Sequence, residues 1–465
     1  MIWTKRRLVG AVTLGALVIT AVGWRAAQTI RIGVAYKAKI VCSGIFVSER
    51  DPRAVVADLE IDDLSILRHI GVAADTSSRT VTASALGLLR RRAVYRDGLG
   101  CTLLLDGLTP PASVRPGAAF DAPDGQPSTQ GAIAIASTPD GVVPEKLASV
   151  INDAFSDPDP QRPRRTQAVV VVRHGRILGE HYAAGIGADT PLIGWSMAKS
   201  VLNALAGILV GQGRLTLDAP APVPEWQEPG DSRSSISLDQ LLRMSSGLRF
   251  DEDMSSPRAD VMRMLLDVGD AAALAIGQDL VAAPGTRWEY SSGSSNIIAR
   301  VIRNTLQDDS EYLAFPRRAL FDHLGMARAV IETDAAGTFV ASSHMYATAR
   351  DWARFGMLYL RDGVWDGEQI LPEGWVAYSV SPAPADPRKH YGAHFWLEVP
   401  NEYCGTGDSL PREAFHAAGH EGQFVTIVPS RDAVIVRLGR TRYPETWDHC
   451  AFVRGVLAAL DQVPE

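Results

Sequence analysis

Ser196 and Lys199 are the residues of this chain whose types and spacing most directly suggest covalent chemistry. They open an apolar run over residues 201–210, and a Ser and a Lys three positions apart lie on one face of a helix. A serine at a helix N-terminus lies among unpaired backbone N–H groups, at the positive end of the helix dipole. Because a neighbouring lysine can accept the hydroxyl proton, the pair predicts a serine nucleophile with a lysine base.

The alternative is a capped helix with a surface lysine. The chain contains six lysines against forty arginines, so composition predicts roughly 0.4 chance occurrences of Ser-x-x-Lys. This is the only occurrence in the chain. Taken alone, the motif leaves both interpretations open.

Two later segments carry groups that could complete such a site. Tyr290 and Ser292 place a phenol and a hydroxyl on one loop, and a tyrosine beside a lysine ammonium can have its pKa lowered and act as a base. The alternative is a half-buried tyrosine with a satisfied hydroxyl. The segment Gly419-His420-Glu421-Gly422-Gln423 is a glycine-rich turn leading into a strand, against which a substrate could lie.

That turn suggests an oxyanion hole. The N–H of Gln423 could be its second donor, with the N–H of Ser196 as the first. His420 could face the substrate as a donor or proton carrier, or be a turn histidine without a role.

Together and in this order, these segments resemble the three motifs of the β-lactamase and penicillin-binding-protein-like serine hydrolases. Ser196-Met197-Ala198-Lys199, Tyr290-Ser291-Ser292 and His420-Glu421-Gly422 stand where that family has S-x-x-K, Y-x-N and K-T-G or H-x-G. Residues 241–248 and 320–326 also resemble segments of the family. The resemblance covers about residues 145–460 and is greatest to the class C-type branch, which includes 6-aminohexanoate-dimer hydrolases and related esterases.

The resemblance implies an acyl-enzyme mechanism without a metal or organic cofactor. Ser196, Lys199 and Tyr290 would be catalytic. The residues expected to bind the oxyanion or the substrate are Gln423, Ser292, His420 and Gly422.

Two departures from the family pattern bear on the substrate. Ser292 stands where the family usually has Asn, and its hydroxyl has a shorter reach. His420 and Glu421 replace Lys and Thr, so the fixed charge that would pair a β-lactam or peptide carboxylate becomes a titratable imidazole. Both changes favour an amidase or esterase for small linear substrates.

Two other functions stay open. One is a cell-wall D,D-carboxypeptidase or β-lactamase. The other is a membrane-anchored, non-catalytic binding protein with an inactive hydrolase fold, and the joint presence of Ser196, Lys199 and Tyr290 argues against it. We expect the pocket walls to come from residues 250–257 and 378–391, and we interpret Asp251-Glu252-Asp253 as a solvated loop without calcium-site spacing.

The order of apolar patterns predicts an α+β fold for residues 144–465. Strands are expected at 167–172 and 177–182 as a hairpin, then at 392–398, 422–428 and 432–438, with a mostly helical middle and a closing helix at 450–460. This order suggests one antiparallel sheet assembled from both ends of the domain around a large helical insertion, flanked by helices as in the β-lactamase-like fold.

The N-terminus suggests export. Lys5-Arg6-Arg7 precedes an apolar run over residues 8–24, so residues 1–28 are expected to be a membrane anchor or signal, preferably an uncleaved anchor. This places the protein in a bacterial-type cell envelope, anchored in the inner membrane with its catalytic domain on the periplasmic or extracellular side. Residues 29–143 are expected to form an accessory segment, in which 40–47 is a strand or short buried run and 110–130 a linker.

Cysteine content and composition agree with an exported globular protein. Four cysteines allow three disulfide pairings, and we expect Cys42–Cys101 and Cys404–Cys450 because each pair stays within one segment. The chain has 465 residues, of which 46% are hydrophobic and 21% charged, with a net charge of −7. Without a basic stripe, no nucleic-acid partner is expected. The expected partners are a small amide or ester substrate and a membrane.

Overall fold

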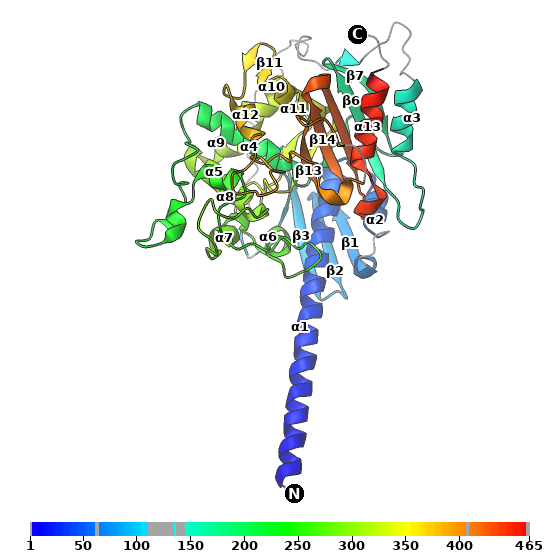
Figure 1. Cartoon of the computed structure of the whole chain (residues 1–465). Coiled ribbons are helices and arrows are strands. Elements are labelled where there is room, and N and C mark those ends of the chain that lie inside the picture. The colour runs from blue at the N-terminus through cyan, green and yellow to red at the C-terminus, as the bar shows by residue number, and fades with distance from the viewer. Residues whose placement is uncertain are drawn as a thin grey trace.

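A six-stranded sheet forms the centre of the structure, a computed structural model (Figure 1). Its strands, in spatial order, are β13 (Phe415–Gly419), β14 (Gln423–Val428), β15 (Ala433–Gly439), β6 (Thr166–Arg173), β7 (Arg176–Tyr182) and β5 (Ala134–Ile135). Neighbouring strands are antiparallel, except that β5 and β7 are parallel. The hairpin β6–β7 opens the main domain and β13–β15 close it, which confirms the predicted α+β arrangement.

The structure describes residues 2–60, 65–105, 107–109, 134–135, 145–405 and 409–461. For residues 2–23, 60, 65–66 and 134–135 it describes the backbone alone. The predicted linker at 110–130 lies outside the described residues.

Helices cover both faces of the sheet, so its central strands are apolar on both sides. Along β6, Val170 and Val172 belong to one core, whereas Val169 and Val171 belong to the other, because successive strand side chains point to opposite faces. The first core is covered by α4 (Met197–Gly211) and α11 (Ala349–Leu360), and the second by α3 (Glu145–Asp153) and α13 (His449–Leu460). Two short turns flank these elements, η6 (Pro429–Arg431) and η7 (Pro444–Thr446).

A mainly helical block lies between β8 (Leu192–Ile193) and β13. After α4 its elements are η2 (Pro224–Trp226), η3 (Ser232–Ser235), α5 (Leu238–Leu242), α6 (Asp260–Leu266), α7 (Ala271–Ile276), α8 (Ser292–Leu306), α9 (Asp309–Pro316), η4 (Arg317–Phe321), α10 (Asp322–Leu324), β9 (Val330–Ile331) and β10 (Met345–Ala347). Beyond α11 follow β11 (Val364–Trp365), β12 (Glu368–Gln369), α12 (Trp375–Ser379) and η5 (Asn401–Tyr403). β8, β10 and β9 form a small sheet in that order.

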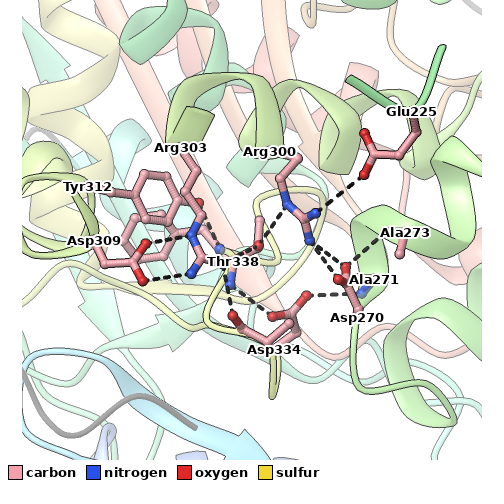
Figure 2. Close-up of polar contacts among 12 residues, drawn as sticks. Glu225, Asp270, Ala271, Ala273, Arg300, Arg303, Asp309, Tyr312, Asp334 and Thr338 are labelled. Atoms are coloured by element: carbon pink, nitrogen blue, oxygen red, sulfur yellow. Dashed lines mark hydrogen bonds and ion pairs between the residues drawn. The ribbon is translucent and has the colours of Figure 1, made fainter. Parts of the chain in front are cut away.

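Two arginines of α8 hold the helical block together, as Figure 2 shows. Arg300 donates to both carboxylate oxygens of Asp270 at 2.7 Å, which ties α8 to the start of α7. Arg300 and Arg303 both donate to Thr338 Oγ1, and Asp334 accepts from the Thr338 N–H at 2.9 Å. The loop between β9 and β10 is thereby fixed against α8.

The accessory segment is a small sheet packed on a long helix. The helix α1 (Ile2–Phe46) buries Val34, Ala38 and Val41 against the sheet, and its first half projects away from the body (Figure 1). The sheet contains β1 (Ile70–Asp75), β2 (Thr80–Ala85), β3 (Leu89–Arg96) and β4 (Gly100–Leu103) in that order, joined to α1 by α2 (Pro52–Glu60) and η1 (Ser65–His69). Both predicted disulfides are present: Cys42–Cys101 joins α1 to β4, and Cys404–Cys450 reaches α13.

The membrane anchor predicted for residues 1–28 is not supported by the structure. Residues 2–28 fall in α1, but the side chains of residues 2–23 lie outside the described part. In what is described, none of the helices combines the length and apolarity needed to span a bilayer.

Two element predictions are wrong. Residues 40–47 belong almost entirely to α1 and not to a strand, since a short apolar run has the same pattern in a buried helix. Residues 392–398 form only isolated bridges, Tyr391 with Trp396 and Trp396 with His416. The edge strand that pairs with β14 is instead β13. The sequence did not reveal it because His416 and Gly419 interrupt its apolar pattern.

Candidate active site

The candidate nucleophile Ser196 lies at the N-terminus of α4, where the sequence predicts it. It occupies the N-cap position without a side-chain capping hydrogen bond, which leaves its hydroxyl for other partners. Trp195 directly before it has φ 47°, in the left-handed region that bulky residues rarely adopt. The Gly194 N–H donates to the Met345 carbonyl at 2.8 Å. The turn that presents Ser196 is therefore strained and held by β10, as is common at functional sites.

The Lys199 amine is the centre of the site. Its Nζ lies 3.1 Å from Ser196 Oγ, 3.1 Å from Ser292 Oγ and 2.9 Å from the Ser342 carbonyl oxygen. It also lies 4.9 Å from the centre of the Tyr290 ring. Lys199 is only 1% exposed. The structure thus brings together Ser196, Lys199, Tyr290 and Ser292. The sequence motifs predicted all four as site residues.

The pKa shifts separate the roles of Lys199 and Tyr290. Burial lowers the pKa of Lys199 to about 8, although the negative charge of Glu252 acts in the opposite direction. Burial and then the charge of Glu252 raise the pKa of Tyr290 well above its usual value and outweigh its hydrogen bond with Ser196. The expected lowering of the Tyr290 pKa is therefore contradicted. Lys199 is the better proton acceptor, and Tyr290 is a neutral hydroxyl beside the nucleophile.

Glu252 is the site residue that the sequence did not reveal. Its Oε1 accepts hydrogen bonds from the backbone N–H of Ser292 at 2.9 Å and from the Ser292 hydroxyl. Burial raises the pKa of Glu252, whereas the charge of Lys199 lowers it. The interpretation of 251–253 as a solvated loop holds for the exposed Asp251 and Asp253 but not for Glu252. The sequence contained one indication of this role, because Glu252 lies within residues 250–257, which were expected to line the pocket.

A buried histidine fixes the backbone of Lys199 from behind. His394 Nδ1 donates to the Lys199 carbonyl oxygen at 2.9 Å, and its Nε2 lies 3.2 Å from Ser295 Oγ of α8. Burial, with a smaller effect from the Lys199 charge, lowers the pKa of His394 to about 3. The imidazole is thus neutral and serves as a positioning group between α4 and α8.

The third predicted segment lies at the turn between β13 and β14. A Cβ atom on Gly419 would lie 3.2 Å from Ser196 N and 2.2 Å from the Gly194 oxygen, so this approach requires glycine. His416 exchanges both backbone hydrogen bonds with Trp396 across the open edge of β13, and the two-residue period of a strand directs the His420 N–H to the same edge. The N–H groups of Ser196 and His420 are therefore the better oxyanion pair.

Gln423 and Gly422 lie behind this edge and do not line the cavity. The Gln423 side chain is buried and binds the backbone of Gly439 through both its amide nitrogen and its amide oxygen, at 2.5 and 3.0 Å. Gly422 has φ 79°, and its carbonyl oxygen accepts from Arg437 at 2.8 Å. We therefore propose the His420 N–H, in place of that of Gln423, as the second oxyanion donor, and we infer that Gly422 and Gln423 shape the turn.

A cavity of about 350 Å³ opens over Ser196. Its lining is mostly apolar and aromatic: Trp195, Ser196, Glu252, Met254, Val261, Leu265, Tyr290, Ser292, Ser343, Trp396, Pro400, Glu402, Tyr403, Ala418, Gly419 and His420. Tyr290 stacks on Trp396 with ring centres 5.6 Å apart, and the His420 ring meets Trp195 edge-on at 5.7 Å. The predicted wall at 250–257 contributes Glu252 and Met254, whereas none of the described lining residues comes from 378–391.

Sequence similarity to known proteins identifies the family of this chain. The Beta-lactamase family model matches residues 151–458, more than half of the chain. The chain belongs to the Beta-lactamase family. It is 26% identical over 325 residues to the 6-aminohexanoate-dimer hydrolase of Paenarthrobacter ureafaciens, covering 64% of this chain and 79% of that protein.

Solved structures share the fold at low sequence identity. A family VIII carboxylesterase superposes with a TM-score of 0.55 at 14% identity, covering 71% of this chain and 99% of the other. A penicillin-binding protein homologue from Caulobacter crescentus gives a TM-score of 0.53 at 17% identity, covering 69% and 99%. These likenesses establish the architecture, and the substrate has to be argued from the site itself.

The described lining of the cavity carries more acidic than basic side chains. Among the described residues that line it, the basic side chain is His420, and no lysine or arginine takes part. Glu252 and Glu402 give the lining two carboxyl groups. Across the described chain, no group of three His, Cys, Asp or Glu side chains is placed to hold a metal ion.

The lowered pKa of Lys199 predicts the pH dependence of activity. Below about pH 8 the amine is mostly protonated and cannot take the Ser196 proton, so kcat/KM should rise with pH and level off above about pH 8. Replacing Glu252 by Gln removes a charge that raises the Lys199 pKa, so the rising limb should move to lower pH. Ester hydrolysis measured from pH 5 to 10 checks both. A limb that stays in place or moves to higher pH would contradict the assignment.

Proposed function

We propose that this chain is a serine amidase or esterase that cleaves small linear substrates through an acyl-enzyme on Ser196. The observation that carries the proposal is the contact between Ser196 Oγ and the buried Lys199 Nζ, 3.1 Å apart, at the start of α4 beneath an apolar cavity. The similarity to 6-aminohexanoate-dimer hydrolase supports the same reaction class.

The first half-reaction forms the acyl-enzyme. Ser196 Oγ attacks the carbonyl carbon while its proton passes to the neutral amine of Lys199. The N–H groups of Ser196 and His420 hold the oxyanion of the tetrahedral intermediate. When the intermediate collapses, the bond to the leaving amine or alcohol breaks. Lys199 returns the proton to the leaving group, and the Tyr290 hydroxyl can relay it.

The second half-reaction releases the acid. Water attacks the ester carbon of the acyl-enzyme while Lys199 takes a proton from it, and the second tetrahedral intermediate expels Ser196 Oγ, which regains that proton. No redox step and no cofactor enters this balance. Ser292 and Glu252 position and tune Lys199 throughout, since Ser292 Oγ lies between the amine and the carboxyl group.

Covalent labelling of the full chain tests the proposal. A fluorophosphonate should label Ser196, peptide mapping should locate the adduct, and Ser196→Ala should abolish it. A fluorescent penicillin should give little or no label, because the described cavity lining offers no lysine or arginine for its carboxylate.

Each of the other labelling results would favour a different function. Strong penicillin labelling of Ser196 would favour the D,D-carboxypeptidase or β-lactamase alternative. Absence of label with either reagent from folded protein would overturn the enzymatic reading and favour a binding protein.

A further inference from the structure

Glu252 lines the cavity beside the nucleophile, and one of its two carboxylate oxygens is buried without a partner among the described residues. Its Oε1 is occupied by Ser292, but its Oε2 is buried and has no hydrogen-bond partner within the described parts of the chain. Buried side-chain acceptors are normally satisfied, so an orphaned one needs an explanation. Because Glu252 lines the cavity, a substrate group is well placed to supply the missing donor.

The position of Glu252 restricts where on the substrate that donor lies. Ser292 Oγ contacts both Glu252 Oε1 and Lys199 Nζ, and Lys199 Nζ in turn contacts Ser196 Oγ. Two bridging side-chain groups thus separate the carboxyl group from the oxygen that attacks the carbonyl. We therefore expect a substrate donor that binds Glu252 Oε2 to lie on the side of the scissile carbonyl and not at the far end of a long acyl chain.

The charge balance favours a cationic donor. Lys199 must be neutral to accept the Ser196 proton, and at that moment it no longer compensates the negative charge of Glu252. Hydrogen bonds between ionised partners are also the stronger ones. The other acidic group of the lining, Glu402, lies on the exposed turn η5, so it adds negative potential at the rim of the cavity.

From these contacts we infer that Glu252 binds an ammonium group on the acyl part of the substrate, next to the scissile carbonyl, as in α-amino acyl esters and amides. The inference rests on the proposed function and assigns specificity within it. Glu252 then has two functions. It positions the Lys199 amine through Ser292, and it selects the acyl group of the substrate through Oε2.

Four p-nitrophenyl esters with six-carbon acyl groups test the inference on the full chain: hexanoate, 2-aminohexanoate, 6-aminohexanoate and the adipate monoester. Spontaneous hydrolysis is subtracted with the Ser196→Ala protein. The expected kcat/KM is about 10- to 100-fold higher for 2-aminohexanoate than for hexanoate, the range typical of a hydrogen bond to a charged group. The adipate monoester is expected to be the poorest substrate.

Matched variants assign the preference to one carboxyl group. Glu252→Gln should bring the ratio of 2-aminohexanoate to hexanoate close to one, whereas Glu402→Gln should leave that ratio nearly unchanged. The ratio is the readout because loss of Glu252 also changes the Lys199 pKa, which alters the rates of all four esters together. A wild-type ratio near one, or a ratio that survives Glu252→Gln, would overturn the inference. So would a preference for 6-aminohexanoate that depends on Glu402.

A binding measurement covers the case of an inactive Glu252→Gln variant. In the Ser196→Ala background, 2-aminohexanamide should raise the melting temperature more than hexanamide, and adding Glu252→Gln should remove the difference. Equal shifts by the two amides in the Ser196→Ala protein would contradict the inference. Failure of the proposed function shows itself separately, as absence of fluorophosphonate labelling and of Ser196-dependent turnover of all four esters.

Discussion

Replacing Lys199 by Met is expected to lower kcat/KM for a small ester by about 10³-fold, within the range found for loss of a positioned general base. Met has a similar length but no amine, so the Ser196 proton loses its acceptor at 3.1 Å. The variant should keep its fold, because an apolar side chain in place of a buried lysine removes a desolvated charge. Steady-state kinetics and thermal unfolding of the same preparation measure the two effects.

Lys146→Met is the matched control for this substitution. Lys146 is exposed on α3, and its Nζ is 3.5 Å from the Ala458 carbonyl oxygen, outside the site. This variant should retain wild-type kcat/KM. A Lys199→Met protein that is folded and keeps more than a tenth of the activity would show that another group accepts the proton.

The catalytic groups could be predicted from sequence because each belongs to a short motif on a locally determined element. Ser196 and Lys199 share one helix, and Tyr290 and Ser292 directly precede or open another. Glu252 could not be predicted in the same way, since its burial depends on α8 packing over its loop. The burial of Tyr290, and after it the negative charge of Glu252, both raise the Tyr290 pKa and were hidden in the sequence, which explains the wrong direction expected for that pKa.

The oxyanion hole could likewise be predicted from the sequence only in part. The glycine-rich turn was located, but the choice between the N–H groups of Gln423 and His420 depends on strand register. That register is visible only in the pairing of Gly419 with Gln423 and of His416 with Trp396. A shift of a few residues in the strand boundary therefore changes which N–H group is proposed as the donor, although both lie in the same segment.

Elements with strong local signals were predicted better than those decided by packing. The hairpin β6–β7 and the strands β14 and β15 follow apolar or β-branched runs bounded by turns. Residues 40–47 carry equally apolar side chains, but α1 continues through them because they cover the accessory sheet. The disulfide Cys42–Cys101 was predicted in spite of this, since pairing within a segment does not depend on whether Cys42 is helical.

The joint between the accessory segment and the main domain is a buried ion pair. Glu332 is 0% exposed. It pairs with Lys39 of α1 and accepts hydrogen bonds from Ser43 Oγ at 2.8 Å and Cys101 N at 2.6 Å. Its own N–H donates to the His344 carbonyl at 2.8 Å. These contacts link α1 and β4 to the sheet β8–β10–β9, which leads directly into Ser196.

Glu332→Gln is therefore expected to destabilise the folded protein by about 3–5 kcal/mol, because it leaves the Lys39 ammonium buried without a counter-charge. Lys39→Met should cost a similar amount by leaving Glu332 unpaired. The double variant Lys39→Met/Glu332→Gln should be more stable than either single variant, since no uncompensated charge remains. Urea unfolding of all three, followed by fluorescence, measures the cycle.

An exposed ion pair supplies the control for the buried one. Arg249 and Asp279 lie 2.9 Å apart with side chains 62% and 74% exposed, so Arg249→Met should change the stability by less than about 1 kcal/mol. If Glu332→Gln behaves like Arg249→Met, or if the double variant is no more stable than the single variants, the pair at the joint is not what holds the two parts together. If the expected cycle is observed, the accessory segment is a structural part of the hydrolase. Glu332, the counter-charge of Lys39, lies on the loop between β9 and β10, and β10 holds the turn before Ser196.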